Sequence, residues 1–206
     1  MTAPRRLSAA FIALAIVSLS CNATPLPADR ATAPEPFDYA AFESSAAAHR
    51  AAEVLGVLET GLLPREISQV SVAIAAESSR ADLPIELVLA VIQVESSGQN
   101  FAVSPVGAMG LMQLMPATAE DVAGRIGLCW AGPPTLFDPV FNVQLGVRYL
   151  RELIDRYDSV PVALAAYNWG PTRIAETLRR GEPVPVVYAQ RVLAVYEKAR
   201  HATLQI

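Results

Sequence analysis

The chain has 206 residues and a formal net charge of −4, with 52% hydrophobic and 17% charged residues. This length suits one domain with appended segments. The excess of acidic side chains argues against nucleic acid as the main partner, because binding to phosphates needs a basic surface. The two histidines lie far apart, outside any zinc-binding spacing, and no glycine-rich phosphate motif occurs. We therefore expect no metal and no cofactor.

Residues 1–20 have the layout of a secretory signal peptide. Two arginines form the charged start, and the apolar run over residues 7–19 is too short for a comfortable membrane span. The run ends at Cys21, with the small Ser20 directly before it, as in a bacterial lipobox. Ser18 departs from that pattern, which prefers leucine there. The layout favours lipidation of Cys21, and ordinary cleavage nearby is the alternative.

Two segments separate this leader from the main domain. Residues 21–36 contain four prolines among small residues, which predicts an extended tether. Residues 37–65 are alanine-rich with apolar residues near helical spacing, which predicts a helical N-terminal extension. This extension either packs on the main domain or stays loosely attached to it.

From residue 66 to residue 206 the apolar residues follow the helical period through most of the chain. No run of alternating apolar and polar residues predicts a strand. The fold class is therefore all-α, with at most a minimal β-hairpin in the glycine-broken loop at 97–115. The expected helices are 66–80, 85–96, 116–126, 138–157, 161–167, 170–180 and 185–201.

Glu95 lies at the C-terminal end of the expected helix 85–96, which is apolar nearly all round. The helix dipole and burial both disfavour a charged carboxylate there and raise its pKa. An acid that stays protonated near neutral pH can donate a proton to a glycosidic oxygen. Taken alone, Glu95 is more simply a solvated glutamate at a helix end. No acidic residue follows it before Glu120, so the pair of carboxylates of common glycosidases is not visible locally.

Four pieces of the chain form an ordered pattern within residues 81–200. They are Glu95-Ser96, the run Ser-Pro-Val-Gly-Ala-Met-Gly-Leu-Met-Gln-Leu-Met-Pro at 104–116, Asn142-x-x-x-Gly146-x-x-Tyr149-Leu150, and Ala166-Tyr167-Asn168-x-Gly170-Pro171. Together they resemble the soluble lytic transglycosylase family, which shares its core with goose-type lysozymes. The resemblance implies a lysozyme-like α-helical domain. It also implies cleavage of the β-1,4 bond between N-acetylmuramic acid and N-acetylglucosamine in peptidoglycan, in which the muramyl C6 hydroxyl closes on C1.

The resemblance also implies roles for individual side chains. Glu95 acts first as acid and then as base, and Ser104 forms a hydrogen bond that orients it. The hydroxyl of Tyr167 points toward the acid and the scissile sugar, and Asn168 contacts the substrate. Tyr188 stands where the family often has a tyrosine beside the substrate groove. Simpler structural roles exist: Ser104 can cap a turn, Tyr167 can end a helix in the core, and Asn168 can be a turn residue.

The Met/Gln/Leu segment adds further candidates. Gln113 lies among apolar residues, where a buried amide needs partners, and we favour a substrate contact for it. Met112 is a candidate for orienting or binding the substrate, although Met112 and Met115 at this spacing are more often core residues. Trp130 is equally suited to stacking on a sugar or packing a loop. Asn142 looks structural.

The sequence therefore predicts an exported lytic transglycosylase, a periplasmic lipoprotein of the outer membrane. Its expected partners are peptidoglycan glycan strands and, through Cys21, the membrane; partners in the envelope or a secretion machinery are left open. One alternative is a muramidase that uses water as the acceptor. Another is a non-catalytic peptidoglycan-binding or secretion-scaffold protein, against which the joint presence of Glu95, Gln113 and Tyr167 speaks.

Overall fold

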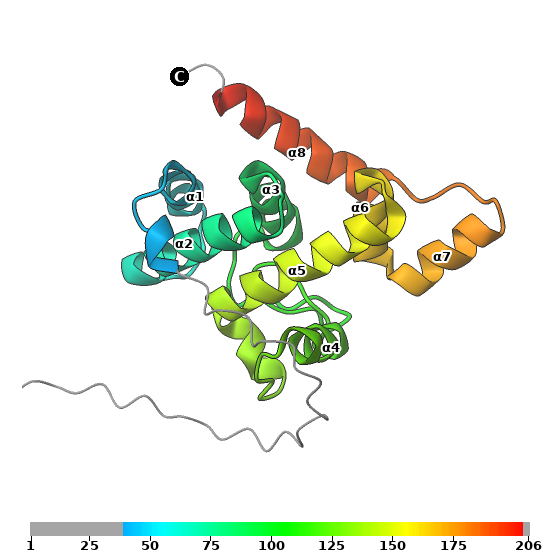
Figure 1. The fold of residues 1–206 in the computed structure, drawn as a ribbon, viewed down its shortest axis with the longest axis horizontal. Helices are drawn as coiled ribbons and strands as arrows, with labels where there is room; N and C mark the ends of the chain where they lie inside the picture. The colour runs from blue at the N-terminus through cyan, green and yellow to red at the C-terminus, as the bar shows by residue number, and fades with distance from the viewer. Residues whose placement is uncertain (1–38, 204–206) are drawn as a thin grey trace, which may run out of the picture. The chain divides into compact units, whose positions relative to one another are not determined.

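The computed structural model describes residues 39–203, with side chains to residue 201, all within a unit that spans Thr32–Ile206 (Figure 1). The expected signal peptide, Cys21 and the tether over 21–36 lie outside the described residues. The elements are η1 (Tyr39–Phe42), α1 (Ala46–Val57), α2 (Pro64–Arg80), α3 (Ile85–Ser96), α4 (Pro116–Ile126), η2 (Pro133–Phe137), α5 (Pro139–Tyr157), α6 (Val160–Trp169), α7 (Pro171–Arg179) and α8 (Val187–Thr203).

The all-α prediction is confirmed for the described residues. Their only β-type pairing is a pair of isolated bridges that join Met109 to Val103 and to Leu114. This is the minimal hairpin expected in the loop at 97–115. Among the helices of residues 39–203, none combines the length and the apolar character that crossing a membrane requires.

Prolines begin most of the helices. In α2, α4, α5, α6 and α7 a proline occupies the first or second helical position, where its missing N–H leaves no bond unmade. An aspartate caps α5: Oδ1 of Asp138 accepts hydrogen bonds from the N–H groups of Val140 and Phe141 at 3.0 and 3.1 Å. The chain between α4 and α5, where no helix was expected, contains the short helix η2.

The N-terminal helix α1 packs on the main core. Its Ala51 and Leu55 are fully buried in the same apolar cluster as Val88 of α3 and Leu164 of α6. Of the two arrangements that the sequence left open for this segment, the packed one is observed. The division of the chain into an extension at 37–65 and a domain at 66–206 stays a prediction.

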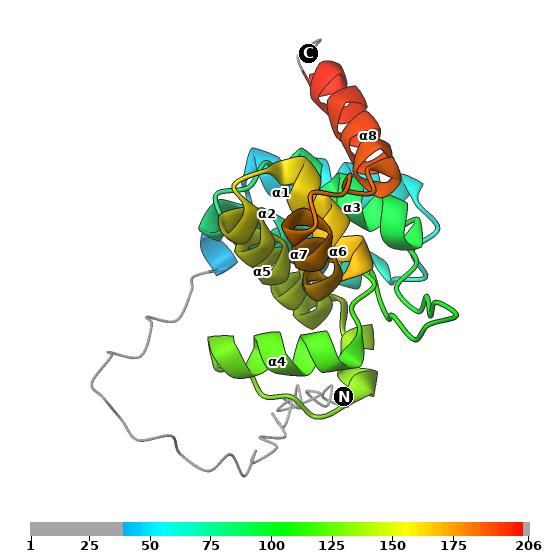
Figure 2. The same cartoon turned by 90° about the vertical axis from the view of Figure 1, so that its right-hand side faces the viewer.

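Helix α5 is buried on two sides. Val143 and Val147 belong to the main apolar cluster, whereas Leu145 belongs to a smaller cluster with Val122 of α4 and Leu136 of η2. Figures 1 and 2 both show α5 between α4 and the α2–α3 pair. This helix therefore links the small α4 layer, and the loop that leads into it, to the rest of the fold.

A buried ionic cluster, which the sequence did not predict, joins η1, α2 and α5. Glu77 is 1% exposed, and its carboxylate accepts hydrogen bonds from Tyr39 Oη (2.5 Å) and Arg148 Nε (3.3 Å). Gln144 in turn donates to Tyr39 Oη at 2.7 Å. Burial, followed by the bond to Glu77, raises the pKa of Tyr39 to about 12. The partners offset the cost of burying the Glu77 charge.

Candidate active site

Glu95 meets a tyrosine from the far end of the chain. Most residues of helix α3 are buried, and its C-cap is Ser97, whose φ of 55° is left-handed. The half-buried Glu95 therefore lies at the end of the helix. Oε1 of Glu95 accepts a hydrogen bond of 2.6 Å from the hydroxyl of Tyr188 in α8. Packing of α8 against α3 thus brings together two side chains that are 93 residues apart.

The surroundings of Glu95 favour its protonated form. Burial raises the pKa of this carboxyl above its ordinary value, while the Tyr188 hydrogen bond and the positive charge of Arg191 lower it by less. The direction agrees with the sequence expectation. Burial and the nearby Glu95 charge also raise the pKa of Tyr188, which keeps its hydroxyl a hydrogen-bond donor. An acid in this setting stays protonated to higher pH than an exposed glutamate and can donate its proton.

Asn142 of α5 holds the loop that follows Glu95 in the chain. Its buried side chain accepts a hydrogen bond from the Met112 N–H at 2.8 Å and donates to the carbonyl oxygens of Met109 and Leu136, each at 3.0 Å. Gly110, with φ of 80°, allows this close approach, because a Cβ there would lie 2.2 Å from Asn142 Nδ2. The structural role expected for Asn142 is confirmed.

Two further side chains fix the same loop from α3 and α6. The buried Ser96 hydroxyl donates to the carbonyl oxygen of Leu111 at 2.8 Å, and the Tyr167 hydroxyl donates to that of Met112 at 2.8 Å. The Glu95 charge raises the pKa of Tyr167, although burial is the larger cause. The Tyr167 proton is bonded to the Met112 carbonyl, and the role toward the acid and the sugar that the resemblance implied for this hydroxyl stays a prediction.

Met112 takes part in the site through its backbone alone. Its side chain is fully buried, and a Cβ on Gly146 would lie 2.4 Å from its sulfur. A substrate contact by this side chain, one of the roles considered from the sequence, is therefore wrong, and the core interpretation holds. Met115 differs from the core expectation, because it is 41% exposed at the start of α4. Trp130 stacks on Phe141, with ring centroids 6.4 Å apart, and packs the loop.

Three predicted site residues have local roles or exposed positions. Ser104 Oγ accepts a hydrogen bond of 3.0 Å from the Ala108 N–H and so caps a turn; the described residues contain no hydrogen bond between Ser104 and Glu95. The Gln113 amide donates to the carbonyl oxygens of Ala102 and Gly110, each at 3.0 Å. Asn168 is exposed near the end of α6. The roles in orientation and substrate contact predicted for these three stay predictions.

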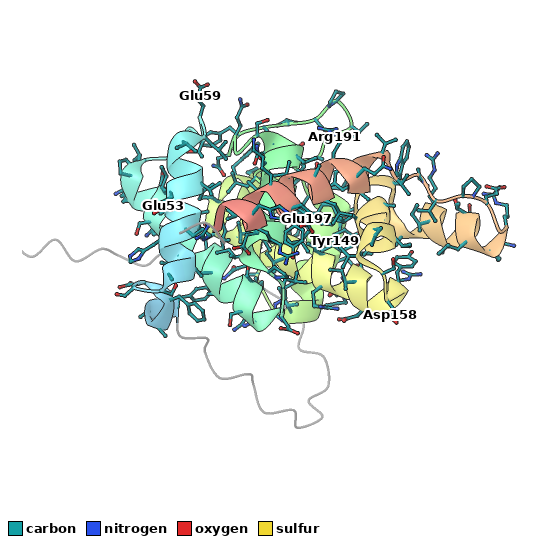
Figure 3. All side chains as sticks on the ribbon, turned by 90° about the horizontal axis from the view of Figure 1, so that it is seen from above. Glu53, Glu59, Tyr149, Asp158, Arg191 and Glu197 are labelled. Carbon is teal, nitrogen blue, oxygen red and sulfur yellow. The ribbon has the colours of Figure 1, made fainter. Side chains whose placement is uncertain are left out.

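Arg191 was missed by the sequence reasoning. It lies on α8 three residues after Tyr188, exposed to solvent, and is labelled in Figure 3. Its charge is the third largest influence on the pKa of Glu95. The helical spacing from Tyr188 was the only available signal, because residues three apart share a helix face.

No second carboxylate acts on the pKa of Glu95 in the described part of the chain. The groups that shift its pKa are Tyr188 and Arg191, and no carboxylate is among them. Residues 39–203 also contain no group of three His, Cys, Asp or Glu side chains placed to hold a metal ion. The site therefore offers an acid that is hydrogen-bonded to Tyr188 and whose pKa the charge of Arg191 lowers.

The chain is similar to several proteins with related names. It is 45% identical over 97 residues to a transglycosylase of Enterobacteria phage PRD1, covering 47% of this chain and 33% of that protein. It is 30% identical over 152 residues to membrane-bound lytic murein transglycosylase C of Histophilus somni, covering 63% and 41%. The structure of an inactive mutant of lytic transglycosylase Slt from Pseudomonas aeruginosa matches with a TM-score of 0.57 and 27% identity, covering 64% of this chain and 24% of that one.

These relatives are longer than the region they share with this chain, which spans about a third of the phage protein. The structural match bears out the lysozyme-like helical fold expected from the motifs. Residues 72–183, more than half of the chain, match the transglycosylase SLT domain, so the chain belongs to the transglycosylase SLT domain family.

Proposed function

We propose that this protein is a peptidoglycan lytic transglycosylase in which Glu95 is the catalytic acid and base. The observation that carries the proposal is the single half-buried acid at the end of α3. Glycosidases with two catalytic carboxylates place them about 5 to 10 Å apart. A second carboxylate at the short end of that range would act on the pKa of Glu95, and none does in the described residues. The proposal therefore assigns an internal hydroxyl of the substrate as the acceptor.

The reaction needs one carboxyl group in two protonation states. In the first step, protonated Glu95 gives its proton to the glycosidic oxygen, and the bond from that oxygen to C1 of N-acetylmuramic acid breaks. An oxocarbenium-like state or the N-acetyl group of the sugar holds the charge at C1. In the second step, the Glu95 carboxylate takes the proton of the C6 hydroxyl while the oxygen of that hydroxyl bonds to C1. The product is a 1,6-anhydro end, no water is consumed, and Glu95 is protonated again.

The environment of Glu95 suits both steps. Burial stabilises the protonated acid that starts the cycle, and the Tyr188 hydroxyl and the Arg191 charge stabilise the carboxylate left after the first transfer. The names of the relatives support the activity, since they are called transglycosylases or lytic murein transglycosylases. The matching Pseudomonas aeruginosa enzyme was solved as an inactive mutant with glutamine in place of a glutamate.

We also propose roles for three residues of the sequence motifs: substrate contacts for Asn168 and Gln113, and orientation of the acid for Ser104. Asn168 is exposed, one residue before the end of α6 and directly after Tyr167. The Gln113 amide nitrogen is bound to the loop, which fixes the direction of its oxygen. Ser104 is proposed to orient Glu95 through its hydroxyl proton, which the turn does not use.

Mass spectrometry of the products from purified sacculi tests the proposed activity. The wild-type chain should release muropeptides with 1,6-anhydro ends, and Glu95→Gln should release none. Reducing ends in place of anhydro ends would make the protein a muramidase. Binding to sacculi without any cleavage by the wild type would favour the non-catalytic alternative.

We also propose that the protein works in the cell envelope as a lipoprotein anchored through Cys21. The layout of residues 1–20 supports export, and a relative is named membrane-bound. The proline-rich tether, some fifteen residues long, would reach roughly 45 Å in an extended form. Labelling with radioactive palmitate should mark the wild type and not Cys21→Ala. Label that persists in this variant would refute the anchor.

A further inference from the structure

The segment that follows α1 contacts the loop that follows Glu95. Residues 58–62 lie before the family match, which begins at residue 72. They connect α1 to α2, and they carry no residue that the motifs marked as functional. In Figure 3, Glu59 marks this segment and Arg191 marks α8, with the green loop after α3 between the two labels.

Leu58 fills the space beside Gly98. A Cβ added to Gly98 would lie 2.8 Å from Leu58 Cδ1 and 3.0 Å from Leu58 Cβ, so the leucine packs directly on the glycine backbone. Gly98 also has φ of 82°, and the preceding Ser97 has φ of 55°. Two successive left-handed residues are a strained way to leave a helix, particularly for Ser97, which has a side chain. Such a turn persists when its surroundings hold it in place.

Further contacts continue along the next residues. The backbone N–H of Asn100 donates to the carbonyl oxygen of the buried Thr60 at 3.1 Å. The Phe101 ring lies 3.8 Å from the position of a Cβ on Gly61. Asn100 is 1% exposed, and its side chain donates to the carbonyl oxygen of Phe137 at 2.9 Å. The loop is thus held between the segment after α1 and η2.

This loop is connected to the acid by a short path. Gly98 is three residues after Glu95, and its N–H donates to the Ser96 hydroxyl at 3.1 Å. That hydroxyl also binds the Leu111 carbonyl, which belongs to the loop fixed by Asn142 and Tyr167. A shift of Gly98 therefore moves the cap of α3 and the Ser96 hydrogen bonds together, directly beside Glu95.

We propose that residues 58–62, from outside the matched family region, form a buttress that positions the turn at 97–101 and through it Glu95. The inference rests on the proposed function, in which Glu95 is the reacting acid. Leu58 and Thr60 touch neither the acid nor a reacting atom, so they are positioning residues. The buttress gives residues 58–62 a role in positioning the acid, beyond that of a connection between α1 and α2.

A pair of leucine substitutions in the full-length chain separates positioning from stability. Leu58→Ala removes the Cγ and Cδ atoms that pack on Gly98 and keeps only Cβ there. Leu55→Ala, three residues earlier, removes the same atoms from the fully buried core and leaves that contact in place. We expect Leu58→Ala to lower kcat about tenfold, because small misplacements of reacting groups are costly. Leu55→Ala should lower Tm more than Leu58→Ala does and keep kcat within about twofold at 25 °C. Val57→Ala, at an exposed position, serves as the surface control.

Hydrogen exchange provides a measurement that does not depend on activity. Exchange at residues 97–101, including the Asn100 amide, should become faster in Leu58→Ala and not in Val57→Ala. Equal kcat values for Leu58→Ala and Leu55→Ala, in a wild-type background that cleaves, would overturn the buttress. A wild type that cleaves nothing would overturn the proposed function instead. In that case unchanged exchange at 97–101 in Leu58→Ala would overturn the buttress as well. Faster exchange would support the claim that residues 58–62 position the turn at 97–101.

Discussion

The two sides of Glu95 are positioned in different ways. On the loop side, residues 97–114 are held by side-chain hydrogen bonds that Ser96, Asn142 and Tyr167 make to the loop backbone. On the α8 side, Tyr188 donates its hydrogen bond to Glu95 from a helix whose buried residues, such as Val192, belong to the main apolar cluster. One side is therefore specified by polar contacts at fixed backbone positions, and the other by apolar packing plus a single hydrogen bond.

This difference indicates how each side should respond to substitution. Buried hydrogen bonds to a loop are costly to remove, because each leaves an unsatisfied backbone group. A helix fixed by apolar packing keeps its position when one hydroxyl is removed, so only the chemistry of the acid should change. Substitutions on the loop side should affect stability, and those on the α8 side should affect the pH dependence of activity.

The largest effect is expected at the acid, where the two sides meet. Glu95→Gln should lower the rate of sacculus cleavage by at least 10²- to 10⁴-fold, the usual contribution of acid–base catalysis. Turbidity loss of a sacculus suspension measures this rate. A variant with full lytic activity would remove Glu95 from the mechanism.

The same variant has an expected effect on stability. The raised folded-state pKa of Glu95 contributes stability below its unfolded pKa, and this contribution is lost as the pH rises through the folded value. Glu95→Gln lacks this loss, so it should be more stable than the wild type at neutral pH. The gap should narrow in acid, as urea unfolding at several pH values would show.

Asn142→Ala should produce the largest loss of stability on the loop side. It leaves the Met112 N–H and the carbonyl oxygens of Met109 and Leu136 without their partner, at a cost of about 3 kcal/mol or more in the free energy of unfolding. Urea denaturation measures this cost. Asn168→Ala removes an equivalent amide from an exposed position and should leave stability unchanged. Equal losses of stability in the two variants would contradict the view that the Asn142 hydrogen bonds hold the loop in place.

On the α8 side, Tyr188→Phe should shift the pH profile with little loss of stability. The Tyr188 hydrogen bond lowers the pKa of Glu95, so its removal raises that pKa further. Because the first step needs protonated Glu95, the alkaline limb of kcat should move to higher pH. A limb that moves to lower pH would show that Tyr188 supports the protonated acid.

Arg191→Gln should cause the smallest change, in the same direction. The arginine is exposed, so the effect of its charge on Glu95 is screened by salt. The shift of the alkaline limb should be smaller than that in Tyr188→Phe and should diminish at high ionic strength. A shift that is independent of salt would indicate a direct contact in place of a long-range charge.

The helices were largely predictable from the sequence because their signals are local. The bounds of α3 at 85–96 and α4 at 116–126 follow from apolar periodicity and from proline placement, and both agree with the structure. The loop at 97–115 was identified by its glycines and by motif resemblance. The double burial of α5 was not foreseen, because helical spacing does not show that Leu145 packs in a second cluster.

The site was predicted less completely, because its contacts depend on tertiary packing. The spacing of α3 placed Glu95 at a helix end, but nothing local indicated that Tyr188 would be its hydrogen-bond partner. Motif matching selected Met112 without distinguishing its side chain from its backbone, and the backbone is the part that contacts Tyr167. The burial of Glu77 could not be predicted, because its partners come from two distant segments.

The tight fit of Met112 against Gly146 has a consequence under oxidative stress. Peroxide converts accessible methionines to sulfoxides, so Met115, at 41% exposure, should react first. The enclosed sulfur of Met112 should react only when the domain opens around it. Once oxidised, it would carry an added oxygen for which the space beside Gly146 has no room. Lasting inactivation would then begin in the core of the protein, with Glu95 chemically intact, and its reversal would need a methionine sulfoxide reductase.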